Sequence, residues 1–197
     1  MAALIPSASA TGSGTMTLAG PSTNSNQTIT IPDTTGTMMV SGNMPAFSVY
    51  PSASQSIANT TSVLMQCDTK TGSSQLFDTA GAFNNTGSTA TLNGISVPAW
   101  SYAPPVAGYY LIGVYGSLSG ATGLVAPQIK VNTTFVNVTS YASSASYLGG
   151  LNEVLTYLNG TSDYVQFYLY QNSGVSQSTL ASRPDLYKFF GHLVRAA

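Results

Sequence analysis

Charged side chains are scarce in this chain, and this scarcity limits what the protein can be. They account for 6% of its 197 residues, against about 25% in an ordinary soluble protein, whereas hydrophobic residues reach an ordinary 43%. Disordered chains are typically poor in hydrophobic residues and rich in charge, so this balance predicts a folded domain with a buried core. A formal net charge of -1 gives little repulsion between copies, which favours association.

Basic patches and long apolar runs are both missing, which argues against two classes of partner. The five basic residues are scattered along the chain and are balanced by six acidic ones. Nothing in this arrangement would neutralise the backbone of a nucleic acid. No apolar run approaches the ~18 residues that a membrane-spanning helix needs. We therefore expect neither a nucleic acid nor a membrane as a partner.

Cysteine is nearly absent as well. The single cysteine, Cys67, cannot form an internal disulfide, and in the β-like run Leu64-Met65-Gln66-Cys67 it is expected to be a small buried residue. The opening residues 1–6 lack the positive charge and the longer apolar stretch of a secretory leader. These features favour assembly in a reducing cytoplasm over secretion.

Residues that carry catalysis or bind metals are equally few. The only histidine, His192, lies in a strand-like pattern and is expected to be a structural or partly exposed residue. No serine has a Gly-x-Ser-x-Gly setting, and no pair of nearby carboxylates with flanking aromatics resembles a glycosidase site. Asp33, Asp68 and Asp78 are isolated, so no metal cluster is visible. We expect no enzyme activity, no cofactor and no metal.

Residues 1–42 have a pattern of their own. Two short runs, Thr15–Leu18 and Thr28–Ile31, alternate threonine with an apolar residue, which is typical of β-strands. The apolar members of both runs share one face and are Met16, Leu18, Ile29 and Ile31. Because a strand pair alone is marginally stable in water, this face needs a partner surface. We predict that residues 1–42 form an attachment arm that binds its partner through these four side chains.

The residues of this arm resemble a known segment. Thr17-Leu18, then Pro21, then Thr28-Ile29-Thr30-Ile31-Pro32-Asp33-Thr34-Thr35-Gly36-Thr37 is similar to a stretch of bacteriophage tail-fibre and related virion-surface proteins, where it precedes a larger module. The resemblance implies a virion protein. A Thr-rich β linker of another kind of protein is the alternative at this point, since alternating Thr and Ile also follows from strand propensity.

Residues 43–197 contain strand-like runs that recur at short intervals between turn residues, which predicts an all-β sandwich or jelly roll. In Tyr109–Tyr115 both alternating faces are apolar or aromatic, so we expect this strand to be buried on both sides. Leu151–Leu158 is the only helix-like stretch, and the flanking Gly149-Gly150 and Asn159-Gly160 favour a strand there.

Four separated motifs occur in the order found in one protein family. They are Ala46-Phe47-Ser48, Phe77-Asp78-Thr79-Ala80-Gly81-Ala82-Phe83, Pro105-Val106-Ala107-Gly108-Tyr109-Tyr110 and Tyr187-Lys188-Phe189-Phe190-Gly191-His192-Leu193. Together they resemble the C1q-like branch of the C1q and tumour-necrosis-factor superfamily. The resemblance implies a ten-stranded jelly roll that assembles as a homotrimer. Two departures are an insert over residues 88–102 and the lack of a collagen-like Gly-X-Y stalk before the domain.

The run Asp163–Tyr170 offers a candidate trimer surface. Its alternation places Val165, Phe167 and Leu169 on one face and Tyr164, Gln166, Tyr168 and Tyr170 on the other. Interface cores are rich in tyrosine and poor in charge, so Tyr164, Tyr168 and Tyr170 are predicted to form the trimer contact. An exposed Tyr-rich sheet face, stabilised by cross-strand pairs, is the alternative.

These observations lead to a non-enzymatic virion structural protein. The favoured hypothesis is a homotrimer, assembled in the host cytoplasm, that decorates the outer surface of the capsid head as a cement or head-fibre protein. Its arm would bind the major capsid protein or other virion proteins. The alternative is a short tail-fibre or spike tip whose loops, including Asn84-Asn85-Thr86 and Trp100, bind a host-surface glycan or protein. The short arm favours decoration, because fibre proteins usually carry a long repetitive shaft.

Overall fold

The computed structural model describes residues 44–73, 75–119, 123–143 and 147–197. Regular structure in these ranges is entirely β, so the prediction of an all-β domain is confirmed. No helix in the described ranges is long and apolar enough to cross a membrane. The predicted arm, with Met16, Leu18, Ile29 and Ile31, lies outside the described residues. The boundary between residues 42 and 43 therefore stays a prediction.

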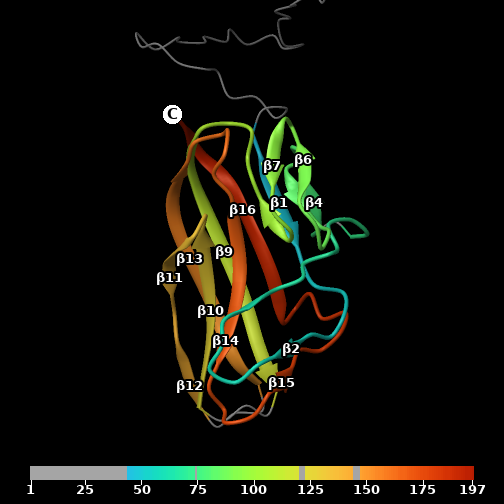
Figure 1. Cartoon of the computed structure of the whole chain (residues 1–197), viewed down its shortest axis with the longest axis vertical. Helices are drawn as coiled ribbons and strands as arrows, with labels where there is room; N and C mark the ends of the chain where they lie inside the picture. Colours follow the sequence, from blue (N-terminus) through green and yellow to red (C-terminus); the bar gives the residue numbers. More distant parts are fainter. Residues whose placement is uncertain (1–43, 74, 120–122, 144–146) are drawn as a thin grey trace, which may run out of the picture. The chain divides into compact units, whose positions relative to one another are not determined.

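Five antiparallel strands form a first sheet, called here the β9 sheet after its most extensively paired strand (Figure 1). In spatial order they are β13 (Tyr147–Leu158), β9 (Gly108–Ser119), β16 (Tyr187–Ala196), β1 (Ala46–Val49) and β4 (Phe77–Asp78). β9 pairs with β13 along its full length and with β16 on its other side. The first and last described strands, β1 and β16, are therefore neighbours.

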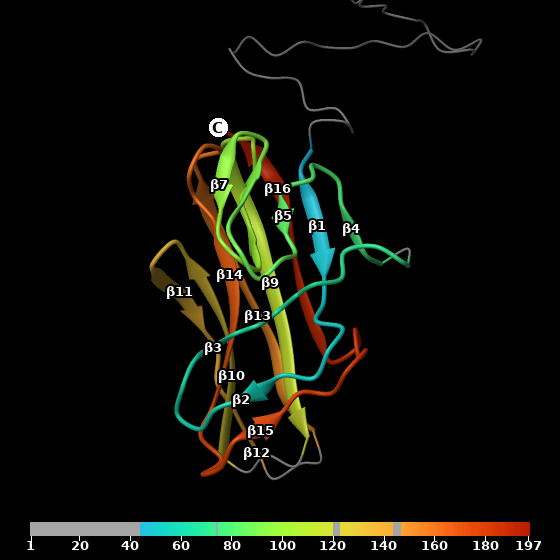
Figure 2. The same cartoon turned by 45° about the vertical axis from the view of Figure 1, so that its right-hand side comes forward.

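The second sheet is called the β14 sheet (Figure 2). In spatial order its main strands are β11 (Thr134–Val138), β10 (Gly123–Val131), β14 (Val165–Gln171), β8 (Ser101–Tyr102) and β5 (Phe83–Asn84). The short strands β12 (Tyr141–Ser143) and β3 (Val63–Leu64) pair with β10 and β14. The chain passes repeatedly from one sheet to the other, as from β8 to β9 to β10, which is the connectivity of a jelly roll.

Two small antiparallel pairs lie outside the main sheets. β2 (Ser56–Ile57) pairs with β15 (Gln177–Ser178), and β6 (Ala90–Leu92) pairs with β7 (Ile95–Val97). The second pair forms most of the predicted insert. Asn93 and Gly94 close this hairpin with φ of 51° and 77°, the left-handed conformation that a two-residue type I′ turn requires.

The inward faces of the two sheets meet in an aromatic core. Phe47 of β1 stacks on Tyr102 of β8 with ring centroids 4.0 Å apart, and it meets Phe189 of β16 edge-on at 4.8 Å. Phe83 of β5 lies 5.7 Å from both Phe47 and Phe189. Each such pair contributes about 0.5–1.5 kcal/mol beyond the burial of its apolar area, so this cluster joins the two sheets.

Several expectations about inward residues are confirmed. The face of β14 that the alternation separated from the tyrosine face, Val165, Phe167 and Leu169, is buried, and one of the two β9 faces expected to be buried, Tyr110, Ile112 and Val114, is buried as well. Cys67 is buried, and burial raises the pKa of its thiol. The Leu151–Leu158 stretch belongs to β13, which confirms the strand interpretation.

The expectation that β9 is buried on both sides is wrong for the single chain. Tyr109 is 45% exposed, and Leu111 and Tyr115 are only half-buried. These side chains lie on the outer face of the β9 sheet, because they alternate with the buried residues of the same strand. The sandwich therefore uses one apolar face of β9 and leaves the other toward solvent.

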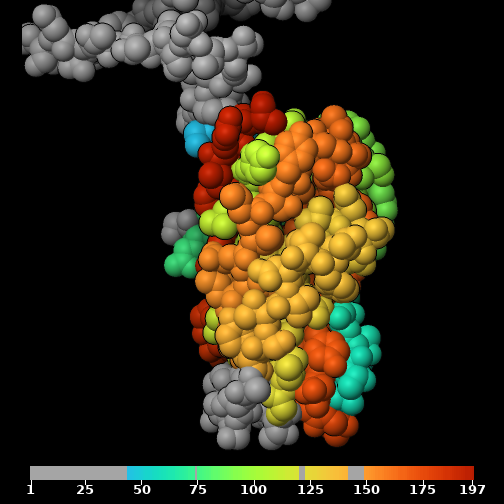
Figure 3. All heavy atoms as spheres, turned by 90° about the vertical axis from the view of Figure 1, so that its left-hand side faces the viewer, coloured from blue at the N-terminus to red at the C-terminus, as the bar shows by residue number. Residues whose placement is uncertain are grey.

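The edges of the two sheets are tied together by a buried amide. Asn152 of β13 is 1% exposed, and its side-chain NH₂ donates to the carbonyl of Pro127 at 2.9 Å and to that of Asn137 at 3.2 Å. Its side-chain oxygen accepts a hydrogen bond from the Thr139 hydroxyl at 3.0 Å. Figure 3 shows this side of the molecule, where residues of β11 and β13 lie next to each other.

The motif around Asp78 forms a tight turn between β4 and β5. The Asp78 carboxylate accepts the backbone N–H groups of Ala82 and Phe83, each at 3.0 Å, and pairs with the Lys70 ammonium at 3.2 Å. Gly81 completes the turn with φ of 60°. The Asp78 side chain is only 4% exposed, whereas the Lys70 side chain is 27% exposed, so the carboxylate is buried and its cation is half-buried.

We expect Asp78→Asn to lower the free energy of unfolding by about 3 kcal/mol, because it removes a buried carboxylate that pairs with Lys70 and accepts two backbone N–H groups. Urea denaturation followed by circular dichroism would measure the change. Asp185→Asn is the matched control, since Asp185 pairs with Arg183 on the exposed surface and its loss should not change stability measurably. Equal losses for the two variants would contradict a structural role of the Asp78 turn.

Candidate assembly interface

The outer face of the β9 sheet carries large apolar side chains in contact with solvent. Its most exposed members come from three adjacent strands and from β4, and they are Tyr109, Leu151, Leu155, Tyr157, Val194 and Phe77. Leu155 alone is 58% exposed. Contiguous apolar surface of this kind marks an interaction site more often than a free surface. We call this surface the outer β9 face.

Strand register arranges these side chains in rows across the sheet. Leu155 of β13 lies opposite Leu111 of β9, which lies opposite His192 of β16. One row further along, Tyr157 lies opposite Tyr109, and their rings meet at 5.6 Å between centroids. The apolar residues are therefore neighbours across strands and form one continuous patch.

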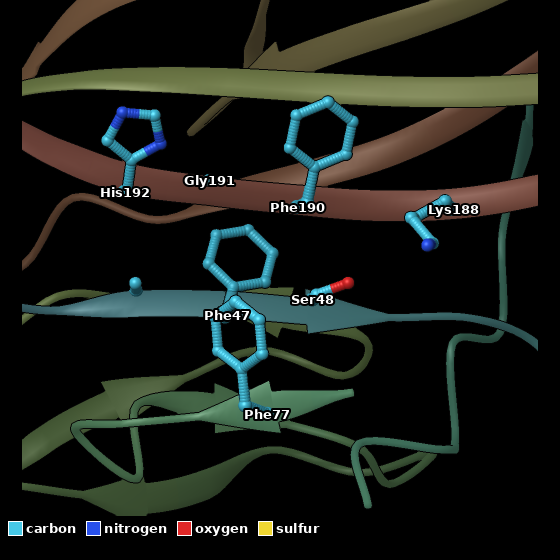
Figure 4. A pocket seen from close by; sticks show the side chains of 8 residues that line it. Phe47, Ser48, Phe77, Lys188, Phe190, Gly191 and His192 are labelled. Atoms are coloured by element: carbon cyan, nitrogen blue, oxygen red, sulfur yellow. The ribbon is translucent and has the colours of Figure 1, made fainter. Parts of the chain in front are cut away.

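A glycine lets one aromatic ring lie flat on this surface. A side chain at Gly113 of β9 would place its Cβ 2.2 Å from Cζ of Phe190, so only glycine admits the ring in that position. Beside Phe190 the surface is hollowed by about 270 Å³, with Ser48 and Phe77 on one side and Lys188 and His192 on the other (Figure 4). This hollow is open and largely apolar, and it suits a side chain of a docked protein better than a small polar ligand.

The outer β9 face has no arrangement for catalysis or metal binding among the described residues. His192 is exposed on β16, with the apolar Leu111 and Ala46 as its neighbours on β9 and β1. No cluster of three or more His, Cys, Asp or Glu side chains within the described ranges could hold a metal ion. The chemistry that this surface offers is apolar contact with a few charges at its margin.

The predicted trimer residues lie on the other sheet. Tyr168 of β14 is half-buried, and its ring meets Phe135 edge-on at 5.4 Å and lies 5.2 Å from the Lys130 ammonium. Tyr164 packs against the small core of the insert, formed around Ile95 and Val97. These rings therefore have partners inside the chain. Their predicted role in a trimer contact, together with that of the half-buried Tyr170, stays a prediction.

The loop predicted for receptor binding is largely occupied by internal hydrogen bonds. The amide of Asn84 is 2% exposed and reaches the carbonyls of Ser88, Val97 and Pro98 at 2.8, 2.9 and 2.9 Å. The amide of Asn85 donates to the carbonyl of Asp68 at 2.9 Å. Both amides thus anchor the insert and the neighbouring loop.

The outer β9 face was not identified from the sequence, although its signal was present. Apolar residues at Tyr109, Leu111 and Tyr115 were interpreted as a second buried face of one strand. The same observation also fits a face that is buried only when copies assemble. Sequence alternation cannot distinguish a face buried within the chain from a face buried between copies, because it gives the character of the side chains and not the surface that they contact.

Comparison with known proteins bears on the fold. No protein-family model matches the sequence, and no curated protein matches it. The solved structure of Eiger TNF from S. frugiperda is similar, with a TM-score of 0.52 at 8% identity over 79% of this chain and 95% of that chain. The chain has a tumour-necrosis-factor-like jelly-roll fold. The predicted all-β jelly-roll fold is thereby confirmed, whereas the N-terminal β arm and the homotrimer stay predictions, and the likeness at this identity says nothing about function.

Weaker similarities involve proteins of two kinds. Murine APRIL at pH 5.0 has a TM-score of 0.48 at 12% identity, over 77% of this chain and 99% of that chain. The PRD1 vertex protein P5 has a TM-score of 0.45 at 17% identity, over 78% of this chain and 98% of that chain.

One substitution in each candidate surface can show whether copies associate through the outer β9 face or through the tyrosine face of the β14 sheet. If copies associate through the outer β9 face, Leu155→Asp should shift the protein from oligomer to monomer, because it places a charge in an apolar contact. Tyr168→Asp on the β14 sheet should leave the oligomer intact. Multi-angle light scattering would measure the mass of each variant, with circular dichroism to check folding. Dissociation by Tyr168→Asp and not by Leu155→Asp would place the contact on the tyrosine face instead.

Proposed function

We propose that this protein is a non-enzymatic structural component of a bacteriophage virion. In this proposal three copies associate through the outer β9 face, and the trimer decorates the capsid head with its three N-terminal arms bound to the major capsid protein or other virion proteins. The exposed apolar face supports self-association. The Thr-rich residues of the arm, which resemble segments of virion-surface proteins, support the virion location.

The size of the outer β9 face suits a stable protein contact. Strands β9 and β13 have 12 residues each. At about 3.3 Å per residue and about 4.8 Å between strands, the face measures roughly 40 Å by 15–20 Å. A standard interface buries about 800 Å² on each partner, which is of the same order. Fully burying one side chain such as Leu155 stabilises by about 1.5–3 kcal/mol, so a few of them give a substantial association energy.

Three linked arms would make attachment strong even if each arm binds weakly. Once one arm of a trimer is bound, the other two act at a high local concentration, which can raise the overall affinity by about 10² or more without new contacts. This gain requires that the spacing of the arms matches the spacing of sites on the shell. Trimerisation and decoration are thus parts of one mechanism in this proposal.

Deletion of residues 1–42 tests whether binding to virus particles depends on the arm while folding of the remaining domain does not. We expect the remaining domain to be soluble and trimeric but unable to bind virus particles, because the predicted contacts of Met16, Leu18, Ile29 and Ile31 are removed. Co-sedimentation with particles that lack this protein would measure binding, with the full-length chain as control. A truncated domain that still decorates particles would show that the arm is not the attachment element.

The location on the particle distinguishes decoration from the alternative of a tail-fibre or spike tip. We expect cryo-electron microscopy of native particles to show trimeric density on the head, at three-fold or quasi-three-fold positions. Density only at the tail would favour a receptor-binding tip and direct attention to the loops of the domain. Absence of the protein from purified particles would contradict both virion roles.

A further inference from the structure

We propose that neighbouring copies are oriented by an ion pair between Glu153 of one copy and Lys188 of the next, formed across the outer β9 face. This inference rests on the proposed trimer and specifies which contact sets its geometry. It follows from the distribution of charge on an otherwise apolar surface, from the lack of an opposite charge beside either group among the described residues, and from the strand register.

Opposite charges on the outer β9 face are kept apart. The negative charge is Glu153 on β13, which is the edge strand of the sheet. The positive charges, Lys188 and Arg195, lie on β16, which is separated from β13 by β9. One side of the surface is therefore negative and the other positive. A contact that brings the β13 edge of one copy onto β16 of the next would match the two signs.

Neither charge is neutralised by an opposite charge among the residues that the structure describes. The Glu153 side chain is exposed and makes no hydrogen bond or ion pair with any described residue, although its backbone carbonyl accepts from Asn137. The Lys188 ammonium contacts only the side-chain oxygen of Gln75, at 3.3 Å, within the described ranges. In contrast, Lys70 is paired with Asp78. This chain has few charged residues, and two of them lie on an apolar face without a counter-ion. A contact between copies would give each of them one.

The strand register selects Lys188 among the positive groups. Glu153 lies opposite Gly113, and Gly113 lies opposite Phe190, so Glu153 and Phe190 are level along the sheet. If neighbouring copies are related by rotation about an axis parallel to the strands, the position of each residue along that axis does not change. Glu153 of one copy therefore stays level with Phe190 of the next. Lys188 is two residues from Phe190, or about 7 Å along the strand, within reach of a long and flexible side chain.

Arg195 and His192 fit this contact less well. Arg195 lies opposite Tyr109 and therefore level with Tyr157, four residues or about 13 Å from Glu153 along the strands. His192 is as close in level as Lys188, but its short side chain reaches less far than the flexible four-carbon stem of a lysine. Lys188 is the cation that combines reach with a permanent charge.

The role of such a pair is orientation more than strength. Apolar contacts such as those of Leu155 and Tyr157 are not directional, so they would tolerate several ways of docking. A pair surrounded by these side chains is partly removed from water, and a misaligned copy would leave both charges in an apolar contact without a partner. The pair therefore penalises the wrong arrangements.

A charge swap tests the pair directly. Glu153→Lys and Lys188→Glu should each raise the concentration at which half of the trimer dissociates by about tenfold or more, since each creates like-charge contacts. The double variant should return it to within about threefold of the original chain. Light scattering over a dilution series would measure dissociation, and circular dichroism would confirm folding. Lys130→Glu, on the other sheet, is the matched control and should have no effect.

The outcomes separate this inference from the proposed function. A trimeric original chain whose two single variants also stay trimeric would overturn the ion pair and leave the trimer intact. Loss of the trimer in both singles without recovery in the double would show that these residues contact something other than each other. A monomeric original chain would remove the proposed trimer and the ion pair together. The milder variants Glu153→Gln and Lys188→Gln apply the same test if a reversal prevents folding, and each should weaken the trimer less than the corresponding reversal.

Discussion

Strand β9 is apolar on both of its faces, and both the interior and the surface of the domain depend on this property. On one side Tyr110, Ile112 and Val114 pack into the core between the sheets. On the other side Tyr109 and Leu111 belong to the outer β9 face. A strand in the middle of a layer gains from burial on both sides, yet a two-layer sandwich can bury only one. The unburied side is the surface through which the proposed association with other copies would occur.

The shortage of charge leaves uncharged polar groups to hold the loops and edges. Asn84 anchors the insert, Asn152 joins the edges of the two sheets, and the side-chain oxygen of Asn159 accepts three backbone N–H groups of the following loop. Buried amides can satisfy donors and acceptors together without the desolvation cost of an ion. Of the few charged groups that remain, Asp78 is buried in a turn and pairs with the half-buried Lys70, while others lie on the apolar face.

This distribution relates the composition to the proposed assembly. A low net charge and an apolar face both reduce the barrier to contact between copies, and in a free monomer they would promote unspecific association. In the proposed assembly, the apolar face would instead be buried in one defined contact. Unpaired charges on the face, such as Glu153, would act against the wrong arrangements in that assembly.

The sequence by itself determined the strand character of the domain and the inward residues of β14, because these follow from local alternation. The four ordered motifs also identified the fold. Only the tertiary structure decided which apolar face stays outside. Tyr168 and Leu155 belong to similar patterns, yet the first has Phe135 and Lys130 beside it and the second faces solvent. The difference depends on which distant strands become neighbours, and that pairing is not encoded in the period of any one strand.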